Sequence, residues 1–187
     1  MKILGISGSL RKGSYNTALL RAAVGLMPQG AELEAATLHG IPLYDGDAEA
    51  AQGIPAAVQS LKAKIVEAQG LLLVTPEYNN SIPGVFKNAI DWLSRPSSDI
   101  AKVFGDRPVG VIGASPGGFG TILAQNAWLA VLRTLGTRPF FGGRLQVSRA
   151  GNVFNEAGEL TDDAIRSLLR KYLRGFVDFT RNGAAGG

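Results

Sequence analysis

The stretch Gly-Ser-Leu-Arg-Lys-Gly-Ser-Tyr-Asn, residues 8–16, leads directly from a short apolar run into an amphipathic helical pattern. Gly8 and Gly13 allow backbone N–H groups to approach an anion at the positive end of the helix dipole. Arg11 and Lys12 add positive charge beside them. The stretch therefore predicts a strand-to-helix loop that binds a phosphate group. The alternative is a tight turn whose polar residues only cap the helix.

Two common nucleotide-binding patterns are absent from this loop. It has neither the Gly-x-x-x-x-Gly-Lys-Ser/Thr pattern of ATP-binding loops nor the Gly-x-Gly-x-x-Gly fingerprint of dinucleotide-binding folds. We therefore do not expect a nucleoside triphosphate at this position.

The rest of the chain repeats the alternation of a short apolar run and a helical pattern. The runs are bounded by Gly or Pro and lack the alternation of a sheet with one wet face, so they indicate buried parallel strands. A last helix is expected to begin near Thr161. Five strands and five helices in alternation predict an α/β fold with a doubly wound parallel sheet. The expected strands cover residues 3–6, 32–38, 71–74, 109–112 and 140–147.

Ligands of such sheets bind beyond the carboxyl ends of the strands, which directs attention to the loops at 75–83 and 114–120. In the first loop, Pro76 and Pro83 fix the backbone, as a site for a flat polar ring requires. In the second loop, glycines leave backbone N–H groups open to a ligand. Each loop also has a purely structural interpretation, as a proline-stiffened connection or a flexible turn. Their position at the same edge of the sheet as residues 8–16 favours one shared binding site.

The composition limits the possible chemistry. The chain of 187 residues has no cysteine, which excludes thiol catalysis and thiolate-bound metals, and its single histidine, His39, excludes a site built from several histidines. We expect no bound metal, so redox chemistry would need a bound organic cofactor. We expect one domain over residues 1–181 and a flexible tail over residues 182–187.

The net charge of +4 is spread along the chain without a basic and aromatic stripe. We therefore expect no nucleic-acid partner. No apolar run approaches the roughly 18 residues of a membrane span, and no signal peptide is visible, so we expect a cytoplasmic protein with no membrane association.

Three motifs resemble those of the NAD(P)H-dependent FMN reductases of flavodoxin-like fold, and among these most closely the bacterial chromate and quinone reductases. They are the stretch at 8–16, Thr-Pro-Glu-Tyr-Asn at 75–79, and Ser-Ile-Pro-Gly-Val-Phe-Lys-Asn-Ala-Ile-Asp-Trp-Leu-Ser-Arg at 81–95. The loop at 114–120 matches the family pattern less closely. The resemblance implies a five-stranded parallel sheet of order 2-1-3-4-5 with helices on both faces.

The resemblance also implies an FMN site in two parts. At the phosphate end, the cofactor-binding residues would be Ser9, Leu10, Arg11, Lys12, Gly13, Ser14, Tyr15 and Asn16. At the isoalloxazine ring they would be Pro76, Glu77, Tyr78 and Asn79, with Ser115, Gly117 and Gly118 completing the ring site.

The activity implied by the resemblance is hydride transfer from NADPH or NADH to flavin N5, followed by reduction of quinones, flavins, azo compounds or metal oxyanions such as chromate. The chemistry lies on the flavin, so no side chain is an obligate acid or base. We expect a ping-pong mechanism, because both substrates would use one open face of the ring. The alternative is a flavodoxin-type electron carrier without NAD(P)H reductase activity, although such carriers are usually acidic and this chain is basic.

The segment after the second loop predicts self-association. Val85, Phe86, Ile90, Trp92 and Leu93 are more apolar than one buried face of a short helix requires, so part of this segment is expected to contact a partner subunit. The family resemblance implies a homodimer or a homotetramer. On the same helix, Asp91 and Arg95 have the spacing of an i,i+4 ion pair.

Overall fold

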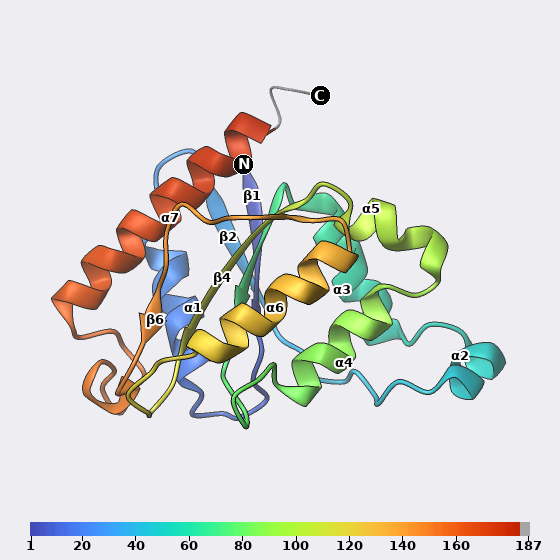
Figure 1. The fold of residues 1–187 in the computed structure, drawn as a ribbon, viewed down its shortest axis with the longest axis horizontal. Coiled ribbons are helices and arrows are strands. Elements are labelled where there is room, and N and C mark those ends of the chain that lie inside the picture. Colours follow the sequence, from blue (N-terminus) through green and yellow to red (C-terminus); the bar gives the residue numbers. More distant parts are fainter. Residues whose placement is uncertain (184–187) are drawn as a thin grey trace.

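The computed structural model describes residues 1–183 and shows a parallel sheet between two layers of helices (Figure 1). The strands are β1 (Lys2–Ser7), β2 (Glu32–Ala36), β3 (Gly70–Val74), β4 (Pro108–Ala114), β5 (Arg138–Pro139) and β6 (Gln146–Val147). Their order is β2-β1-β3-β4-β5, with β6 paired to β4 as well. All pairs are parallel, so the predicted order is confirmed and the carboxyl ends of β1, β3 and β4 lie at one edge.

Helices cover both faces of the sheet. The helices are α1 (Tyr15–Gly25), α2 (Gly46–Gln52), α3 (Ala56–Glu67), α4 (Gly84–Leu93), α5 (Ile100–Phe104), α6 (Ile122–Thr134) and α7 (Asp163–Gly183), with short 3₁₀ turns at Ser97–Asp99 and Ala150–Asn152. Figure 1 shows α1 and α7 on one side of the sheet and α3, α4 and α6 on the other. Among the described residues, no helix has both the length and the apolar character that crossing a bilayer needs.

The end of α7 differs from the sequence-based prediction. The helix continues to Gly183 and so includes two residues of the predicted tail. Residues 184–187, the rest of that tail, lie outside the described residues.

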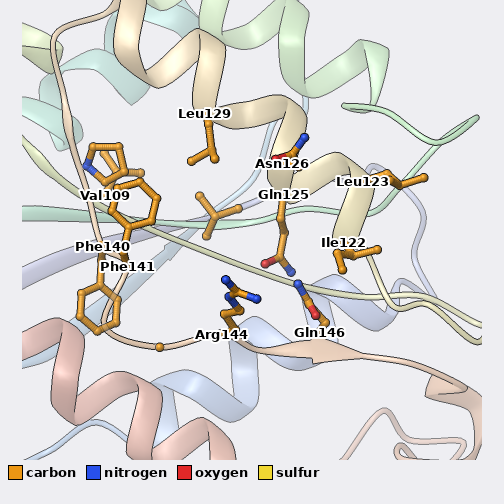
Figure 2. A pocket seen from close by; sticks show the side chains of 13 residues that line it. Val109, Ile122, Leu123, Gln125, Asn126, Leu129, Phe140, Phe141, Arg144 and Gln146 are labelled. Carbon is orange, nitrogen blue, oxygen red and sulfur yellow. The ribbon is translucent and has the colours of Figure 1, made fainter.

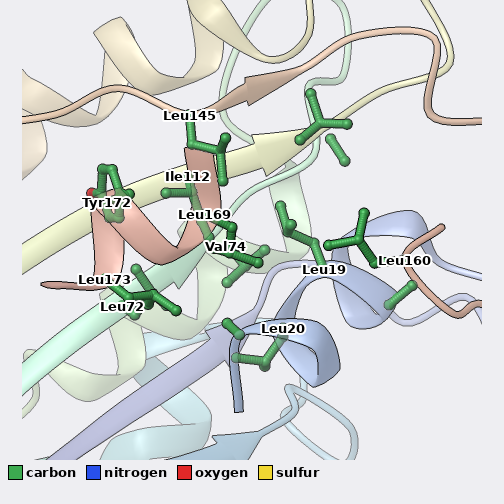
Figure 3. Packing of buried hydrophobic residues seen from close by; sticks show 14 of the residues in the cluster. Leu19, Leu20, Leu72, Val74, Ile112, Leu145, Leu160, Leu169, Tyr172 and Leu173 are labelled. Carbon is green, nitrogen blue, oxygen red and sulfur yellow. The ribbon is translucent and has the colours of Figure 1, made fainter. Parts of the chain in front are cut away.

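The core lies on both faces of β3, whose five residues are all buried. Leu72 and Val74 pack on the side of α1 and α7, where Figure 3 shows them beside Leu19 and Leu169. Leu71 and Leu73 pack on the other side, against α3, α4 and α6. Burial on both faces explains why β3 is a continuous apolar run rather than an alternating one.

The prediction of one continuous strand over residues 140–147 was wrong. The chain pairs with β4 only at β5 and again at β6, and leaves the sheet between them. Phe140 N still donates to Val109 O of β4 at 2.8 Å, and the chain leaves the sheet after this residue. The Phe140 ring packs against Tyr172, Phe176 and Phe179 of α7, with ring centres 5.3, 5.7 and 5.4 Å apart. The following Gly142 and Gly143 lie against the Phe140 and Tyr172 rings, where larger residues would not fit easily.

The predicted ion pair between Asp91 and Arg95 was also wrong. Asp91 pairs with Lys87, one turn earlier on α4, at 2.6 Å. Arg95 instead reaches Glu49 of α2 at 2.8 Å, and this guanidinium holds the pKa of the Glu49 carboxyl below its usual value. The long-range pair ties α2 to the end of α4, which a local spacing rule cannot anticipate.

The apolar residues of α4 are used inside the subunit. Phe86, Ile90, Trp92 and Leu93 are each at most 3% exposed, and the Phe86 and Trp128 rings meet edge to face at 4.9 Å between centres. Their apolar character is explained by packing between α3, α6 and the sheet, so it gives no support to a subunit interface on this segment.

Candidate functional site

The three predicted loops meet at the carboxyl edge of the sheet. Gly8 N donates to Val74 O at 2.9 Å, and Thr75 N donates to Ile112 O at 2.8 Å, so each loop leaves the sheet beside its neighbour. A Cβ atom at Gly8 would collide with the Phe86 ring and lie 2.9 Å from the Pro76 Cδ atom. Glycine at this position therefore allows the first loop to contact the second.

The loop at residues 8–16 folds around the start of α1. The Ser14 hydroxyl caps the helix by accepting from Asn16 N at 3.2 Å and Thr17 N at 3.3 Å. Ser9 Oγ accepts from Arg11 N at 3.3 Å, and the Arg11 guanidinium donates to Gly13 O at 2.6 Å. The polar residues of the loop thus hold its own shape at the positive end of the helix dipole.

A hollow of about 420 Å³ lies beside this loop. Arg11 and Lys12 line one wall, and among residues 1–183 neither forms an ion pair. Two cations without an ion pair at a helix N-terminus suit a phosphate monoester, so the donor set fits the phosphate of FMN. The hollow is also lined by Gly151 and by residues 154–158, which include the acidic Glu156, a segment that the sequence patterns did not indicate.

The Asn16 side chain makes two hydrogen bonds that the sequence did not predict. Its side-chain amide donates to Ala114 O at 2.8 Å and accepts from Ala114 N at 2.9 Å. Both the NH2 group and the carbonyl oxygen of this buried side chain therefore bond to the end of β4. Asn16 joins the start of α1 to the sheet, and its predicted contact with a phosphate has no support in this geometry.

The second loop contains a tight turn that the proline pattern did not reveal. Tyr78 and Ser81 exchange two backbone hydrogen bonds, at 3.2 and 3.1 Å. Between them, Asn79 and Asn80 have φ angles of 49° and 61°, the left-handed conformation that a type I′ turn requires and that asparagine tolerates. The turn presents the Tyr78 side chain, 47% exposed, at the edge where a ring is expected to bind.

The third loop is held by its own hydroxyl and by a distant backbone group. Ser115 Oγ donates to Gly120 O at 2.6 Å, and Arg149 N donates to Gly117 O at 2.9 Å. Space around Gly118 is open, since a Cβ atom there would have no neighbour within 4 Å among the described residues. The loop therefore has bare backbone open to solvent at Gly118, while the Ser115 side chain faces the loop itself.

Sequence patterns missed two further residues that support the loops. His39 Nε2 lies 3.2 Å from Leu10 O, so the end of the β2 segment supports the first loop. Arg149, in a left-handed conformation with φ of 48°, supports the third. The feature that distinguishes Arg149 is its positive φ angle, which is unusual for a residue other than glycine and cannot be deduced from the sequence.

A separate cavity of about 460 Å³ lies beside α6, where the chain leaves the sheet between β5 and β6. Figure 2 shows Arg144 beside Gln125 and Gln146 at its polar end, with Leu129, Phe140 and Phe141 at its apolar end. Its lining residues lie outside the three loops, so this cavity is distinct from the candidate site.

Comparison with protein families gives a match of residues 1–152 to the family described as NADPH-dependent FMN reductase. The chain belongs to this family. It is therefore an oxidoreductase of the FMN-dependent, NAD(P)H-dependent class, as its motifs predicted.

Known relatives agree with this assignment. The chain is 45% identical to an NAD(P)H-dependent FMN reductase of Pseudomonas aeruginosa, over 93% of this chain and 92% of that protein. It is 35% identical to a quinone reductase of Escherichia coli, over 96% of this chain and 95% of that protein. The solved structure of FerB, a flavoenzyme NAD(P)H:(acceptor) oxidoreductase from Paracoccus denitrificans, superimposes with a TM-score of 0.86 at 31% identity, covering 97% and 98% of the two chains.

Proposed function

We propose that this protein is an NAD(P)H:quinone reductase that binds FMN across the three loops. The single observation that carries the proposal is the pair of cations without ion-pair partners among the described residues, Arg11 and Lys12, at the N-terminus of α1. They lie at the same sheet edge as the Tyr78 turn of the second loop and the open backbone at Gly118 of the third. The quinone reductase of Escherichia coli, similar over nearly its whole length, supports a quinone as the acceptor.

Within this proposal, each loop has one task. Arg11 and Lys12 bind the phosphate, and the Ser14 cap holds the loop in shape at the start of α1 by accepting from Asn16 N and Thr17 N. The turn at Tyr78 and the backbone of Gly117 and Gly118 border the ring. When bound, FMN supplies the hydride-accepting N5 atom, and the protein supplies orientation and hydrogen bonds.

The alternative function, a flavodoxin-type carrier that passes electrons to protein partners, uses the same cofactor and fold. The net charge of +4 argues against it, because carriers of this type rely on acidic surfaces for docking. A basic surface instead attracts anionic nicotinamide nucleotides. The two functions differ in whether the isolated protein oxidises NAD(P)H in the presence of a small quinone.

The deciding experiment is a steady-state assay of purified protein loaded with FMN, with NADH and NADPH tested separately against 1,4-benzoquinone. The proposal predicts turnover that is saturable in both substrates and lost when FMN is removed. A protein that holds FMN but shows no turnover above free FMN would be a carrier instead.

Several finer properties remain predictions. They are reduction of free flavins, azo compounds and chromate, a ping-pong order of substrates, a homodimeric or homotetrameric state, and a cytoplasmic location. Each is open to direct measurement by the same assay with other acceptors, by light scattering, or by fractionation of cells.

A further inference from the structure

The first turn of α6 takes its cap from another part of the chain. Thr121, the residue before the helix, makes no side-chain capping bond, and its hydroxyl instead accepts from Gln125 Nε2 at 3.0 Å. The exposed backbone N–H groups at a helix start need a partner. At α6 that partner is Glu77.

The Glu77 carboxylate lies across the start of α6. One of its oxygens, Oε2, accepts from Leu123 N at 2.8 Å and from Ala124 N at 2.9 Å. Both distances are those of charge-assisted hydrogen bonds, and the negative charge faces the positive end of the helix dipole. The contact spans 46 and 47 residues of sequence, so it is a tertiary link rather than a local cap.

This link joins the two loops that are expected to border the flavin ring. Glu77 belongs to the loop that follows β3, whereas α6 begins directly after the loop that follows β4. We propose that Glu77 is a positioning residue that holds these two loops at a fixed separation, so that the ring site is formed before the flavin binds. The inference rests on the proposed function, because it assumes that the ring lies between these loops.

Two physical consequences follow from the proposal. When a ligand binds between two loops, its apparent affinity is the intrinsic affinity multiplied by the fraction of protein in which the loops are correctly placed. Loss of the link should therefore weaken binding of the ring, whether or not a phosphate is attached. The negative charge of Glu77 also balances the positive end of the α6 dipole. Removing this charge leaves the positive helix end unbalanced near the ring, which should raise the flavin midpoint potential.

The test compares riboflavin with FMN, because riboflavin has the ring but lacks the phosphate. In Glu77→Ala and Glu77→Asp, we expect both dissociation constants to rise by the same factor, about ten-fold, the lower end of the contribution of one charge-assisted hydrogen bond. Aspartate keeps the charge but is one methylene too short to reach α6. In Glu77→Gln, an oxygen can still accept from both N–H groups, so we expect a rise of about three-fold or less and an upward shift in midpoint potential.

Two matched variants separate this role from others. Arg11→Ala removes a phosphate contact and should weaken FMN while leaving riboflavin unchanged. Asp162→Ala removes a cap of the same chemistry from α7, where Asp162 Oδ1 accepts from Ile165 N at 2.9 Å, and should lower stability without changing either dissociation constant.

The outcomes are distinguishable. If Glu77→Ala and Glu77→Asp are less stable but bind both flavins normally, Glu77 is only a helix cap and the inference is wrong. If they weaken FMN but not riboflavin, Glu77 acts at the phosphate and the inference is again wrong. If the unaltered protein binds neither flavin, the proposed function fails as well.

Discussion

Replacing Asn16 by alanine removes two buried hydrogen bonds that join the start of α1 to the end of β4. Asn16 is 3% exposed and Ala114 is 2% exposed, and the amide satisfies both the N–H and the C=O of Ala114. The substitution therefore leaves two backbone groups without a partner in an environment that excludes most water.

The cost follows from the number of groups left unpaired. Each buried backbone group without a partner costs about 1–3 kcal/mol, and the small space left by the amide can admit one water that compensates part of this. We therefore expect Asn16→Ala to lower the free energy of unfolding by about 2–4 kcal/mol. For a chain of this size that corresponds to a melting temperature lower by roughly 5–15 °C.

The measurement is urea unfolding of flavin-free protein, followed by circular dichroism. Asn155→Ala is the matched control, because Asn155 also makes two amide hydrogen bonds, both with Glu159 at 2.8 Å, but is exposed. The control should lose less than about 1 kcal/mol, since water replaces the lost partners. Equal losses in the two variants, or a loss below about 0.5 kcal/mol for Asn16→Ala, would refute the assigned role.

Three further predictions concern the loops and the reaction. Arg11→Ala should raise the FMN dissociation constant by about one to two decades, because a charge-assisted contact to phosphate contributes about 1.5–3 kcal/mol. A dissociation constant that is unchanged in fluorescence titrations would show that this loop does not bind the phosphate. Gly8→Ala should lower the free energy of unfolding by about 1–3 kcal/mol, since the added methyl group meets Phe86 and Pro76; a stable variant with normal flavin affinity would contradict the close contact of the two loops. Double-reciprocal plots of NAD(P)H oxidation at several quinone concentrations should give parallel lines, because both substrates are expected to use one ring face; intersecting lines would contradict the shared face.

The strands of the sheet could be predicted because each buried strand is indicated by its own residues. Continuous apolar runs between Gly and Pro mark strands buried on both faces, and the observed order β2-β1-β3-β4-β5 agrees with the family pattern. The fifth strand was the exception. Residues 140–147 have the composition of a strand, but after Phe140, whose ring packs on α7, the chain leaves β4 and pairs with it again only at β6.

The sequence predicted the location of the candidate site but not the role of each residue in it. Strand ends identified the three loops, whereas the partner of each side chain depends on the folded chain. Asn16 is directed to Ala114 and Glu77 to the start of α6, and each contact joins segments more than 40 residues apart. The apolar residues of α4 show the same limit, since Phe86, Ile90, Trp92 and Leu93 contact helices that a pattern on α4 alone does not reveal, and a subunit contact of this segment stays a prediction.

The central claim, that the three loops bind FMN and that this protein reduces it with a nicotinamide, is tested most directly by anaerobic titration. The purified protein, loaded with FMN and separated from free flavin, is mixed with NADPH or NADH without oxygen, and the visible flavin spectrum is recorded. We predict that the absorbance near 450 nm, typical of oxidised flavins in general, is lost within seconds at one equivalent of the preferred nicotinamide. Protein that does not retain FMN, or bound FMN that keeps its absorbance with both nicotinamides, would contradict the account.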